Sequence, residues 1–589
     1  MCVEVPYGTR TLLGAVTSCV PLADMKSQVK NMSFQLKNIN RVIQQSPLSP
    51  AVLLSIQSYH EHTLVPRNLL LDRVIPVHFL ESIREYISDK HSENLDTSQF
   101  LEHHISLLQQ PEPDRISIYM TRVREVLSQG NSIIIICPSV AIVNTLKVQV
   151  GKGIDEHIVV LHGQLTKKKQ SESYQRLFNS KRGVVCIMTP YFLGCAPRST
   201  SLVIIHNSTS SEYLSPMRPY INFVPLIEDF TRTSGIECML SDTLLTLGNT
   251  KRIDTDTRVS WYTHASYRGA QDLSFYSLEH DFSKHIIHPE ILEKIKQKLD
   301  ESKNIALFVP RTGYASITKC NDCQHVVACP TCDAPMRLHR NTKTQHRCTR
   351  CKASVPPVDA CQKCGGSRLV MLGVSVEKVV ECLSEHINSD LIIPITSESM
   401  SKKKNINHLD TLVKKNLGLC VVGTTALLNL SYQFDSMIVV SAAHLFAHTE
   451  YNSYEESLRL GMCLRELTLK EFFIQTPKQY TELVNTYWNM PVLEQLVYEN
   501  ELRKEYELPP HTHKAHIICP SETMNALREF MDTSVHILAS YKPSTLKRMP
   551  YHGYRGGICI EISFQDKKDL RKLIDHLQGF KGSVYILEK

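Results

Sequence analysis

Short apolar runs alternate with amphipathic segments along two long stretches of this chain. In the first stretch, between about residues 116 and 249, the runs lie at 132–138, 158–161, 184–188, 201–206 and 237–240. In the second, Ile291, Ile295 and Leu299 share one face of a predicted helix. Further apolar runs follow at 305–310, 391–396, 417–424 and 436–443. Strands that alternate with helices in this way predict two parallel α/β lobes.

The two ends of the chain show a different pattern. Residues 3–16 predict a strand, a turn around Pro6 and Gly8, and a second strand, as in a small β-rich domain. From about residue 496 the chain predicts a helix and then an α+β unit with a basic, tyrosine-containing loop at 547–557. Basic residues interleaved with tyrosines hold phosphate and stack on bases. An exposed polar hairpin has the same composition and is the alternative.

Eight cysteines between residues 320 and 364 form four Cys-x-x-Cys pairs, and two such pairs supply the four thiolates of a structural zinc site. The inner pairs have the spacing of a zinc ribbon, and the outer pairs enclose them. We therefore expect two zinc ions in a nested arrangement. The first would bind Cys320, Cys323, Cys361 and Cys364, and the second would bind Cys329, Cys332, Cys348 and Cys351. Sequential pairing within residues 320–332 is the alternative.

Zinc is expected here in preference to disulfide bonds, because the chain opens without an apolar signal segment and has the character of a cytoplasmic protein. Gly365, directly after Cys364, can adopt the positive φ that such turns need. Three nearby histidines, His325, His339 and His346, are expected to pack or to face solvent, since eight cysteines already fill two sites.

Length and composition indicate a protein of several domains and exclude a membrane-spanning one. A chain of 589 residues is long enough for several domains. No apolar run approaches the roughly 18 residues of a membrane span, so we expect a soluble protein. The formal net charge of +7 is mild, and contact with nucleic acid would have to come from local basic patches.

Several segments resemble the primosomal replication-restart helicase family, also called primosomal protein N-prime or PriA. The cysteine block is the most specific of them, and 308–315 and 372–377 support it. Residues 5–8 resemble the start of the family's 3'-DNA-binding domain, and 125–138 resembles the segment after its Walker A loop. Weaker likenesses lie at 423–424, 474–476 and 508–510. The resemblance covers most of the chain and implies RecA-like helicase lobes that act on abandoned replication forks.

With this resemblance, the predicted fold class is α/β with two degenerate RecA-like helicase lobes. The predicted domains are a truncated 3'-DNA-binding-type domain at 1–78, a linker at 79–104, lobe 1 at 105–250, lobe 2 at 251–495 with a zinc-binding insertion at 318–368, and a C-terminal α+β domain at 496–589. The family's 3'-hydroxyl pocket is expected to be incomplete, because its acidic strand precedes the turn at 5–8.

The residues at the family's nucleotide-binding positions are not those of an ATPase. Residues Glu112 to Ile116 occupy the Walker A position, where a phosphate cradle needs glycines, a lysine and a hydroxyl. The Walker B position reads His-Asn-Ser-Thr at 206–209 in place of Asp-Glu-Glu-His. No Gln-x-x-Gly-Arg-x-Gly-Arg motif occurs near residues 459–470. We therefore expect the lobes to persist as a scaffold without ATP hydrolysis.

The favoured hypothesis is a zinc-containing, DNA-binding replication-restart protein that recognises forked DNA. Its partners would be primosome proteins and the replicative helicase or its loader. The expected DNA contacts are Tyr7, Arg10, Arg311, Arg337, Arg548 and Arg555. One alternative is a diverged 3'-5' helicase with an unrecognised ATP site, although the lysines at 167–169 are expected on the solvated face of a helix. The other is a zinc protein with partners outside replication.

Overall fold

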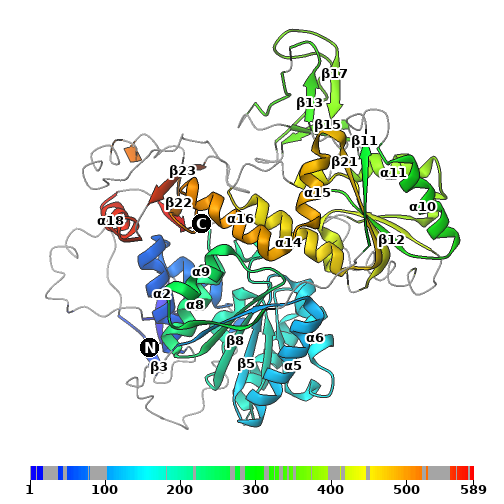
Figure 1. Ribbon diagram of the computed structural model, residues 1–589. Helices are drawn as coiled ribbons and strands as arrows, with labels where there is room; N and C mark the ends of the chain where they lie inside the picture. The colour runs from blue at the N-terminus through cyan, green and yellow to red at the C-terminus, as the bar shows by residue number, and fades with distance from the viewer. Residues whose placement is uncertain are drawn as a thin grey trace.

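Two parallel α/β lobes make up most of the computed structural model (Figure 1). The structure describes residues 2–7, 10–16, 21, 38–43, 49–76, 78–79, 103–180, 182–215, 220–264, 272–278, 286–310, 317–323, 325–330, 336–340, 344–348, 353–372, 374–395, 412, 418–430, 432–445, 451–520, 526–527, 529, 557–564, 567–580 and 584–588. Among these residues, no helix is both long enough and apolar enough to cross a membrane.

The first lobe is a seven-stranded parallel sheet in the order β10-β4-β9-β8-β5-β7-β6. Its strands are β4 (Ile105–Gln109), β5 (Ser132–Ile136), β6 (Ile158–Leu161), β7 (Val185–Met188), β8 (Thr200–His206), β9 (Glu237–Asp242) and β10 (Val259–His264). Its helices are α5 (Glu112–Ser128), α6 (Val140–Val150), α7 (Lys167–Asn179), α8 (Phe223–Ser234) and α9 (Leu247–Thr255). Residues 133–136 of β5 are fully buried, because helices cover both faces of a parallel sheet.

The second lobe is a six-stranded parallel sheet in the order β11-β21-β20-β12-β19-β18. Its strands are β11 (Asp272–Leu278), β12 (Ile305–Phe308), β18 (Ile392–Ile395), β19 (Cys420–Gly423), β20 (Phe434–Val439) and β21 (Thr468–Pro477). Its helices are α10 (Pro289–Asp300), α11 (Val376–Ser384), α14 (Ser453–Glu466), α15 (Thr481–Asn489) and α16 (Val492–Glu505). The predicted stripe of Ile291, Ile295 and Leu299 is buried against this sheet.

Smaller units surround the lobes. At the N-terminus, β1 (Cys2–Tyr7), β2 (Arg10–Ala15) and β3 (Arg41–Ile43) form one sheet, followed by α2 (Pro50–Thr63) and α3 (Arg67–Val74). The cysteine block holds β13 (Ile317–Cys320) with β17 (Leu369–Leu372), and β14 (Met336–Arg340), β15 (Thr344–Cys348) and β16 (Ser354–Val355). At the C-terminus, β22 (His513–Pro520), β23 (Gly557–Phe564) and β24 (Tyr585–Glu588) pack with α18 (Lys567–Leu577). Figure 1 shows β13 and β17 projecting from the second lobe.

Short 3-10 helices connect these elements. They are η2 (Asp155–His157), η3 (Pro190–Cys195), η4 (Ser211–Tyr213), η5 (Ser389–Leu391), η6 (Thr425–Asn429), η7 (Ala442–Leu445) and η8 (Lys478–Tyr480).

The parallel α/β architecture predicted from the sequence is confirmed, and the structure adds strands that the apolar pattern missed. β10 pairs with β4 in the first sheet, so that sheet extends beyond residue 250, where the first lobe was expected to end. α2 and α3, expected in the N-terminal domain, contribute Val52, Leu70 and Val74 to the core of the first lobe. Most of the predicted linker at 79–104 lies outside the described residues.

Candidate functional site

The connection between β4 and α5 is too short for a phosphate-binding loop. Only Gln110 and Pro111 separate the last residue of the strand from the first residue of the helix. A phosphate-binding loop needs several glycine-rich residues at this point, so that its backbone N–H groups can wrap the phosphates. At residues 112–116, which the sequence analysis placed at the Walker A position, the structure forms the first turn of α5.

Arg115, on the first turn of α5, fills the space at the ends of the central strands. It is 2% exposed. Its Nη1 donates to Oδ1 of Asn207 at 2.7 Å, and its Nη2 donates to Oγ1 of Thr243 at 3.4 Å. Asn207 stands at the predicted Walker B position with a φ of 52°. A divalent cation bound at this position would face a buried guanidinium and no carboxylate from Asn207.

His206, at the end of β8, is fully buried and neutral. Burial lowers its pKa well below the usual value, and the charge of Arg115 lowers that pKa further. Its Nδ1 lies 3.0 Å from the hydroxyl of Tyr119, which donates to Oγ of Ser241 at 2.6 Å. Burial also raises the pKa of Tyr119 to about 12, so its hydroxyl keeps its proton. The two rings pack edge to face and hold α5 against the sheet.

A carboxylate that sequence reasoning missed lies beside this cluster. Asp242, the last residue of β9, accepts hydrogen bonds through Oδ2 from the backbone N–H and the hydroxyl of Thr209, at 2.9 and 2.6 Å. Its Oδ1 accepts from the N–H of Thr243 at 2.8 Å. These protein donors occupy both oxygens. Asp242 is therefore engaged in ordering the loop that follows β8.

Arg459, in the region where the family's paired arginines were expected, reaches across to the first lobe. It lies on α14, and its Nη1 donates to the backbone oxygen of Thr209 at 3.2 Å and also contacts the Thr209 hydroxyl. A second contact between the lobes joins Oε1 of Glu455 to the N–H of Leu247 at 3.0 Å. Glu455 is in turn paired with the buried Arg503, at 2.8 Å. Side chains of α14, a helix of the second lobe, thus contact the first lobe at two points.

Glu466, seven residues after Arg459 on α14, occupies the N-terminus of α5. Its Oε2 accepts a hydrogen bond from the backbone N–H of Glu112 at 3.3 Å. The N-terminus of a helix that follows a parallel strand is the usual position for a bound phosphate. Burial raises the pKa of Glu466 to about 7, against the opposing effect of Arg115. A carboxyl group of the second lobe therefore stands where an anion would bind.

Other groups predicted near this site lie away from it. The side chain of Asp114 is exposed on α5. The lysines at 167–169 are exposed on the first turn of α7, where Thr166 caps the helix, so they face solvent as expected. Glu466, Asp242 and Tyr119 were missed because their partners are distant in sequence. The spacing of Arg459 and Glu466, two helical turns apart on one face, is the signal that could have found one of them.

The outer cysteine set forms a candidate metal centre. The sulfurs of Cys320, Cys323, Cys361 and Cys364 all lie within 4.8 Å of one another. Two of the distances are 3.6 Å, between Cys320 and Cys364, and 3.5 Å, between Cys323 and Cys361. A tetrahedral zinc with bonds of about 2.3 Å would separate its sulfurs by about 3.8 Å. The arrangement fits a four-thiolate ion, and these separations are too long for disulfide bonds.

The backbone around the outer set supports metal binding. The N–H of Lys363 donates to the Cys361 sulfur at 3.4 Å. Backbone N–H groups of Cys364 and Lys363 lower the pKa of the Cys361 thiol. Gly365 has a φ of 71°, in the left-handed region that its lack of a side chain permits. Asp322 and Arg368 form an ion pair that joins the two knuckles.

The inner cysteine set is described in part. Cys329 and Cys348 are buried in one small cluster with Val327 and Met336, whereas Cys332 and Cys351 lie outside the described residues. His346 is also buried, with its Nε2 3.1 Å from the hydroxyl of Thr318, as expected for a packing residue. Cys320 and Cys323 gather with Cys361 and Cys364, which is the pairing expected for the outer set. The pairing of the inner set stays a prediction.

The described members of the predicted set of DNA contacts lie in two separate units of the chain. Tyr7 and Arg10 are paired across the β1–β2 hairpin, and Arg337 is paired with Arg347 across β14 and β15. Arg311, Arg548 and Arg555 lie outside the described residues. Within the described part of the chain, the structure gathers no larger group of these residues.

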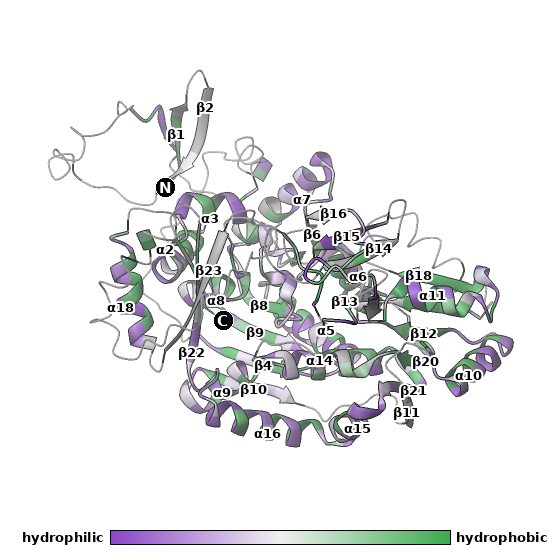
Figure 2. Cartoon of the chain, turned by 90° about the horizontal axis from the view of Figure 1, so that it is seen from above, coloured by the Kyte–Doolittle hydropathy of each residue, from purple (hydrophilic) through white to green (hydrophobic). Residues whose placement is uncertain are grey.

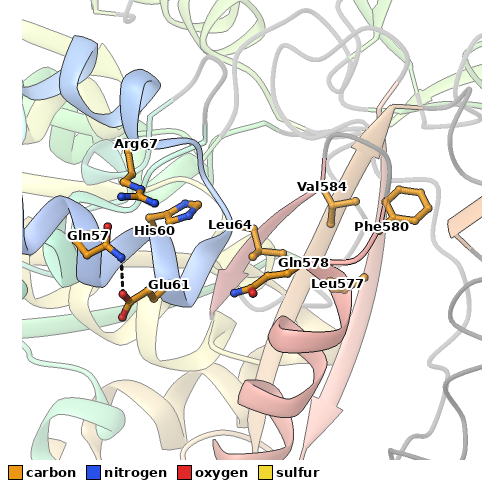
Figure 3. Close-up of a pocket in the computed structure, with 9 residues that line it drawn as sticks. All are labelled: Gln57, His60, Glu61, Leu64, Arg67, Leu577, Gln578, Phe580 and Val584. Carbon is orange, nitrogen blue, oxygen red and sulfur yellow. Dashed lines mark hydrogen bonds between the residues drawn. The ribbon is translucent and has the colours of Figure 1, made fainter. Parts of the chain in front are cut away.

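A hollow lies between the N-terminal helices and the C-terminal domain (Figure 3). Gln57 donates to Glu61 at 2.5 Å on its α2 side, and Nδ1 of His60 lies 2.9 Å from the backbone oxygen of Val65. None of the predicted site residues is among the residues that line it, which are Gln57, His60, Glu61, Leu64, Arg67, Leu577, Gln578, Phe580 and Val584.

Sequence comparison finds relatives that are named replication restart protein PriA. The chain is 21% identical to the replication restart protein PriA of Bacillus subtilis over 447 residues, which covers 72% of this chain and 54% of that protein. It is 20% identical to PriA of Helicobacter pylori over 376 residues, covering 62% and 59%, and 24% identical to PriA of Chlamydia pneumoniae over 345 residues, covering 54% and 43%. No protein-family model matches the chain. The chain spans about half the length of these relatives.

Structural comparison gives weaker matches. The DUF1998 helicase MrfA bound to DNA and AMPPNP aligns with a TM-score of 0.40 and 11% identity, covering 80% of this chain and 57% of MrfA. RecG bound to a three-way DNA junction aligns with a TM-score of 0.40 and 9% identity, covering 78% and 53%. At these scores the alignments do not assign a fold or a function. The sequence comparisons identify the chain as similar to the replication restart protein PriA.

Proposed function

We propose that this chain is a zinc-containing, DNA-binding replication-restart protein that recognises forked DNA and acts as an assembly scaffold for primosome proteins without hydrolysing ATP. The similarity to PriA supports the process and the nucleic-acid partner. The replicative helicase or its loader would be recruited on the assembled scaffold.

One observation supports the proposed absence of ATP hydrolysis. The N-terminus of α5, where a nucleotide phosphate would bind, is occupied by Glu466 of the second lobe, and the adjoining space is filled by Arg115. An incoming phosphate would meet the carboxyl groups of Glu466, Glu112 and Asp242. A magnesium ion would meet Arg115. Because ATP hydrolysis depends on positioning and charge stabilisation at these two places, the arrangement removes both requirements.

The same contacts supply what a scaffold needs. In a nucleotide-driven motor the bound nucleotide brings the lobes together, and its loss lets them part. Here Arg459 binds Thr209, Glu466 binds the N–H of Glu112, and Glu455 binds the N–H of Leu247. These side chains join the lobes in the absence of nucleotide. The lobes would therefore present a constant surface to DNA and to partners.

The zinc module supports contact with DNA. Arg337 and Arg347 are register partners on the neighbouring antiparallel strands β14 and β15, so the hairpin carries two basic residues at one position. Arginine side chains bind the phosphates of a DNA backbone. A zinc-bound hairpin that carries this pair would then offer a basic point of contact to one DNA strand.

Binding to a fluorescent forked DNA tests this function. Fluorescence anisotropy of the zinc-bound full chain should show binding to the fork in preference to a duplex of the same length, and the affinity should fall steeply as salt rises. Equal binding to both DNAs, or binding that ignores salt, would reject fork recognition. Turnover of ATP in the same samples would instead favour a diverged helicase.

A further inference from the structure

Exposed apolar side chains are concentrated in one short part of the chain. Among the described residues, twelve large hydrophobic side chains are exposed, and seven of them lie between Leu469 and Tyr506. These seven are Leu469, Tyr480, Leu483, Leu493, Val497, Tyr498 and Tyr506. Single exposed apolar residues are normal on a protein surface, but a concentration of this kind marks an interaction site.

Helix α16 carries three of the seven on the side that faces away from the protein. Its buried face is formed by Gln495, Leu496, Glu499 and Arg503. Leu493 is 62% exposed and Val497, one helical turn further, is 60% exposed. Figure 2 shows α16 and α15 end to end along one border of the molecule.

The same face of α16 is acidic, although the chain as a whole is basic. Glu494, Glu501 and Glu505 are exposed and form a row between the Leu493–Val497 pair and Tyr498. Lys504 is the one exposed cation on this face of α16. The formal net charge of the whole chain is +7, so the charge of this face of α16 has the opposite sign to that of the chain.

α16 is held rigidly enough to serve as a preformed platform. Arg503 pairs with Glu455 at 2.8 Å and with Glu499 at 2.7 Å, all three side chains being buried. The hydroxyl of Tyr454 on α14 donates to Oε1 of Gln495 at 3.1 Å. A partner that docks on α16 therefore meets a surface that needs no ordering before it binds.

We propose that the exposed face of α16 docks an amphipathic helical segment of another protein, in which lysines or arginines flank the apolar side chains. Complementary charge selects this occupant, because three glutamates favour a basic segment. DNA and anionic membranes carry the same sign of charge as this face and are repelled. A two-fold contact between copies would set the glutamates of one copy against those of the other. The inference does not depend on the proposed function.

The test uses the full zinc-bound chain and a labelled synthetic helix of about 18 residues, roughly five turns, with leucines on one face and lysines flanking them. Fluorescence anisotropy should show saturable binding. The double variant Leu493→Ser/Val497→Ser should bind at least about tenfold more weakly, because the apolar contact is lost. The double variant Glu494→Lys/Glu501→Lys should also bind more weakly, and its remaining binding should depend less on salt.

Two controls separate this surface from general stickiness. Val148 on α6 is 70% exposed and lies in the first lobe, so Val148→Ser should leave peptide binding unchanged. A peptide with glutamates in place of the lysines should not bind. The proposal is overturned if the acidic peptide binds as well, if Val148→Ser weakens binding as much as the α16 variants, or if those variants bind normally. Circular dichroism of each variant shows that it is folded.

Discussion

The carboxyl group of Glu466 accepts a hydrogen bond from the backbone N–H of Glu112 at 3.3 Å, across 354 residues of sequence. This contact places an acidic side chain of the second lobe on the first residue of α5. The N-terminus of this helix, the usual point of phosphate binding in an α/β lobe, is thereby part of a contact between the lobes. The proposed absence of ATP hydrolysis and the joining of the lobes would then have one structural origin.

Removing the charge of Arg115 should destabilise the first lobe. In Arg115→Met, the side chain of Asn207 loses its donor and the nearby carboxyl groups of Asp242 and Glu466 lose a buried cation. Removing one member of a buried charged cluster costs about 3 kcal/mol. Thermal melting should show a clearly lower midpoint. Arg124→Met is the matched control, because Arg124 is exposed on the same helix and its loss should leave the midpoint within about 1 °C.

Glu466 should make stability depend on pH. Its pKa in the folded chain is about 7, above the value of about 4.3 expected in an unfolded chain. The folded state therefore binds this proton more tightly than the unfolded state does. The proton's contribution to the free energy of unfolding is complete below about pH 4.3 and is lost as the pH rises through about 7. The loss amounts to about 4 kcal/mol, from a difference of about 2.7 pKa units at about 1.36 kcal/mol each.

Glu466→Gln removes this titration. Melting midpoints between about pH 5 and 8 should fall with rising pH more steeply in the natural chain than in the variant. The exposed Glu172→Gln on α7 is the control and should follow the natural chain. Parallel curves for the natural chain and Glu466→Gln would show that this carboxyl group is not buried against α5.

Many contacts of this site join residues that lie far apart in the sequence, so no local sequence pattern could predict them. The apolar runs predicted β5, β6, β7, β8 and β9, because strands of a parallel sheet that is covered on both faces are apolar throughout. β4 was missed because Ser106 and Gln109 interrupt its apolar run, and β10 because Ser260 and Thr263 do. The residue types at 112–116 indicated that a phosphate loop is missing. They could not show that Glu466 takes its place, since only folding brings α14 to α5.

The metal-binding role of the cysteines could be predicted from the sequence, because the two ligands of each Cys-x-x-Cys pair are close together in the chain. Cys-x-x-Cys pairs place two sulfurs on one turn, and the outer set is found assembled. We expect two zinc ions per chain by elemental analysis, and about one in Cys361→Ser, because a site with three thiolates binds zinc far more weakly. Cys382→Ser is the control, since Cys382 lies on α11, outside the cysteine block. Unchanged zinc content in Cys361→Ser would exclude the outer site.

The pair Arg337 and Arg347 should contribute to the salt dependence of DNA binding. If both contact phosphates, the double variant to alanine loses two ionic contacts, and the slope of log affinity against log salt should become shallower by about 1.8. The double variant Arg124→Ala/Arg176→Ala, with neither arginine in the zinc module, should keep the natural slope. An unchanged slope in the zinc-module variant would place the DNA elsewhere on the chain.

The central claim is that the lobes are joined by their own side chains and do not turn over ATP. The most direct measurement is the rate of phosphate release by the zinc-bound full chain, with and without a saturating concentration of forked DNA whose binding is followed in the same samples. We predict fork binding with phosphate release no faster than that of a blank without protein. ATP turnover stimulated by the fork would contradict the account, because the contact between Glu466 and Glu112 would then have to open to admit the nucleotide.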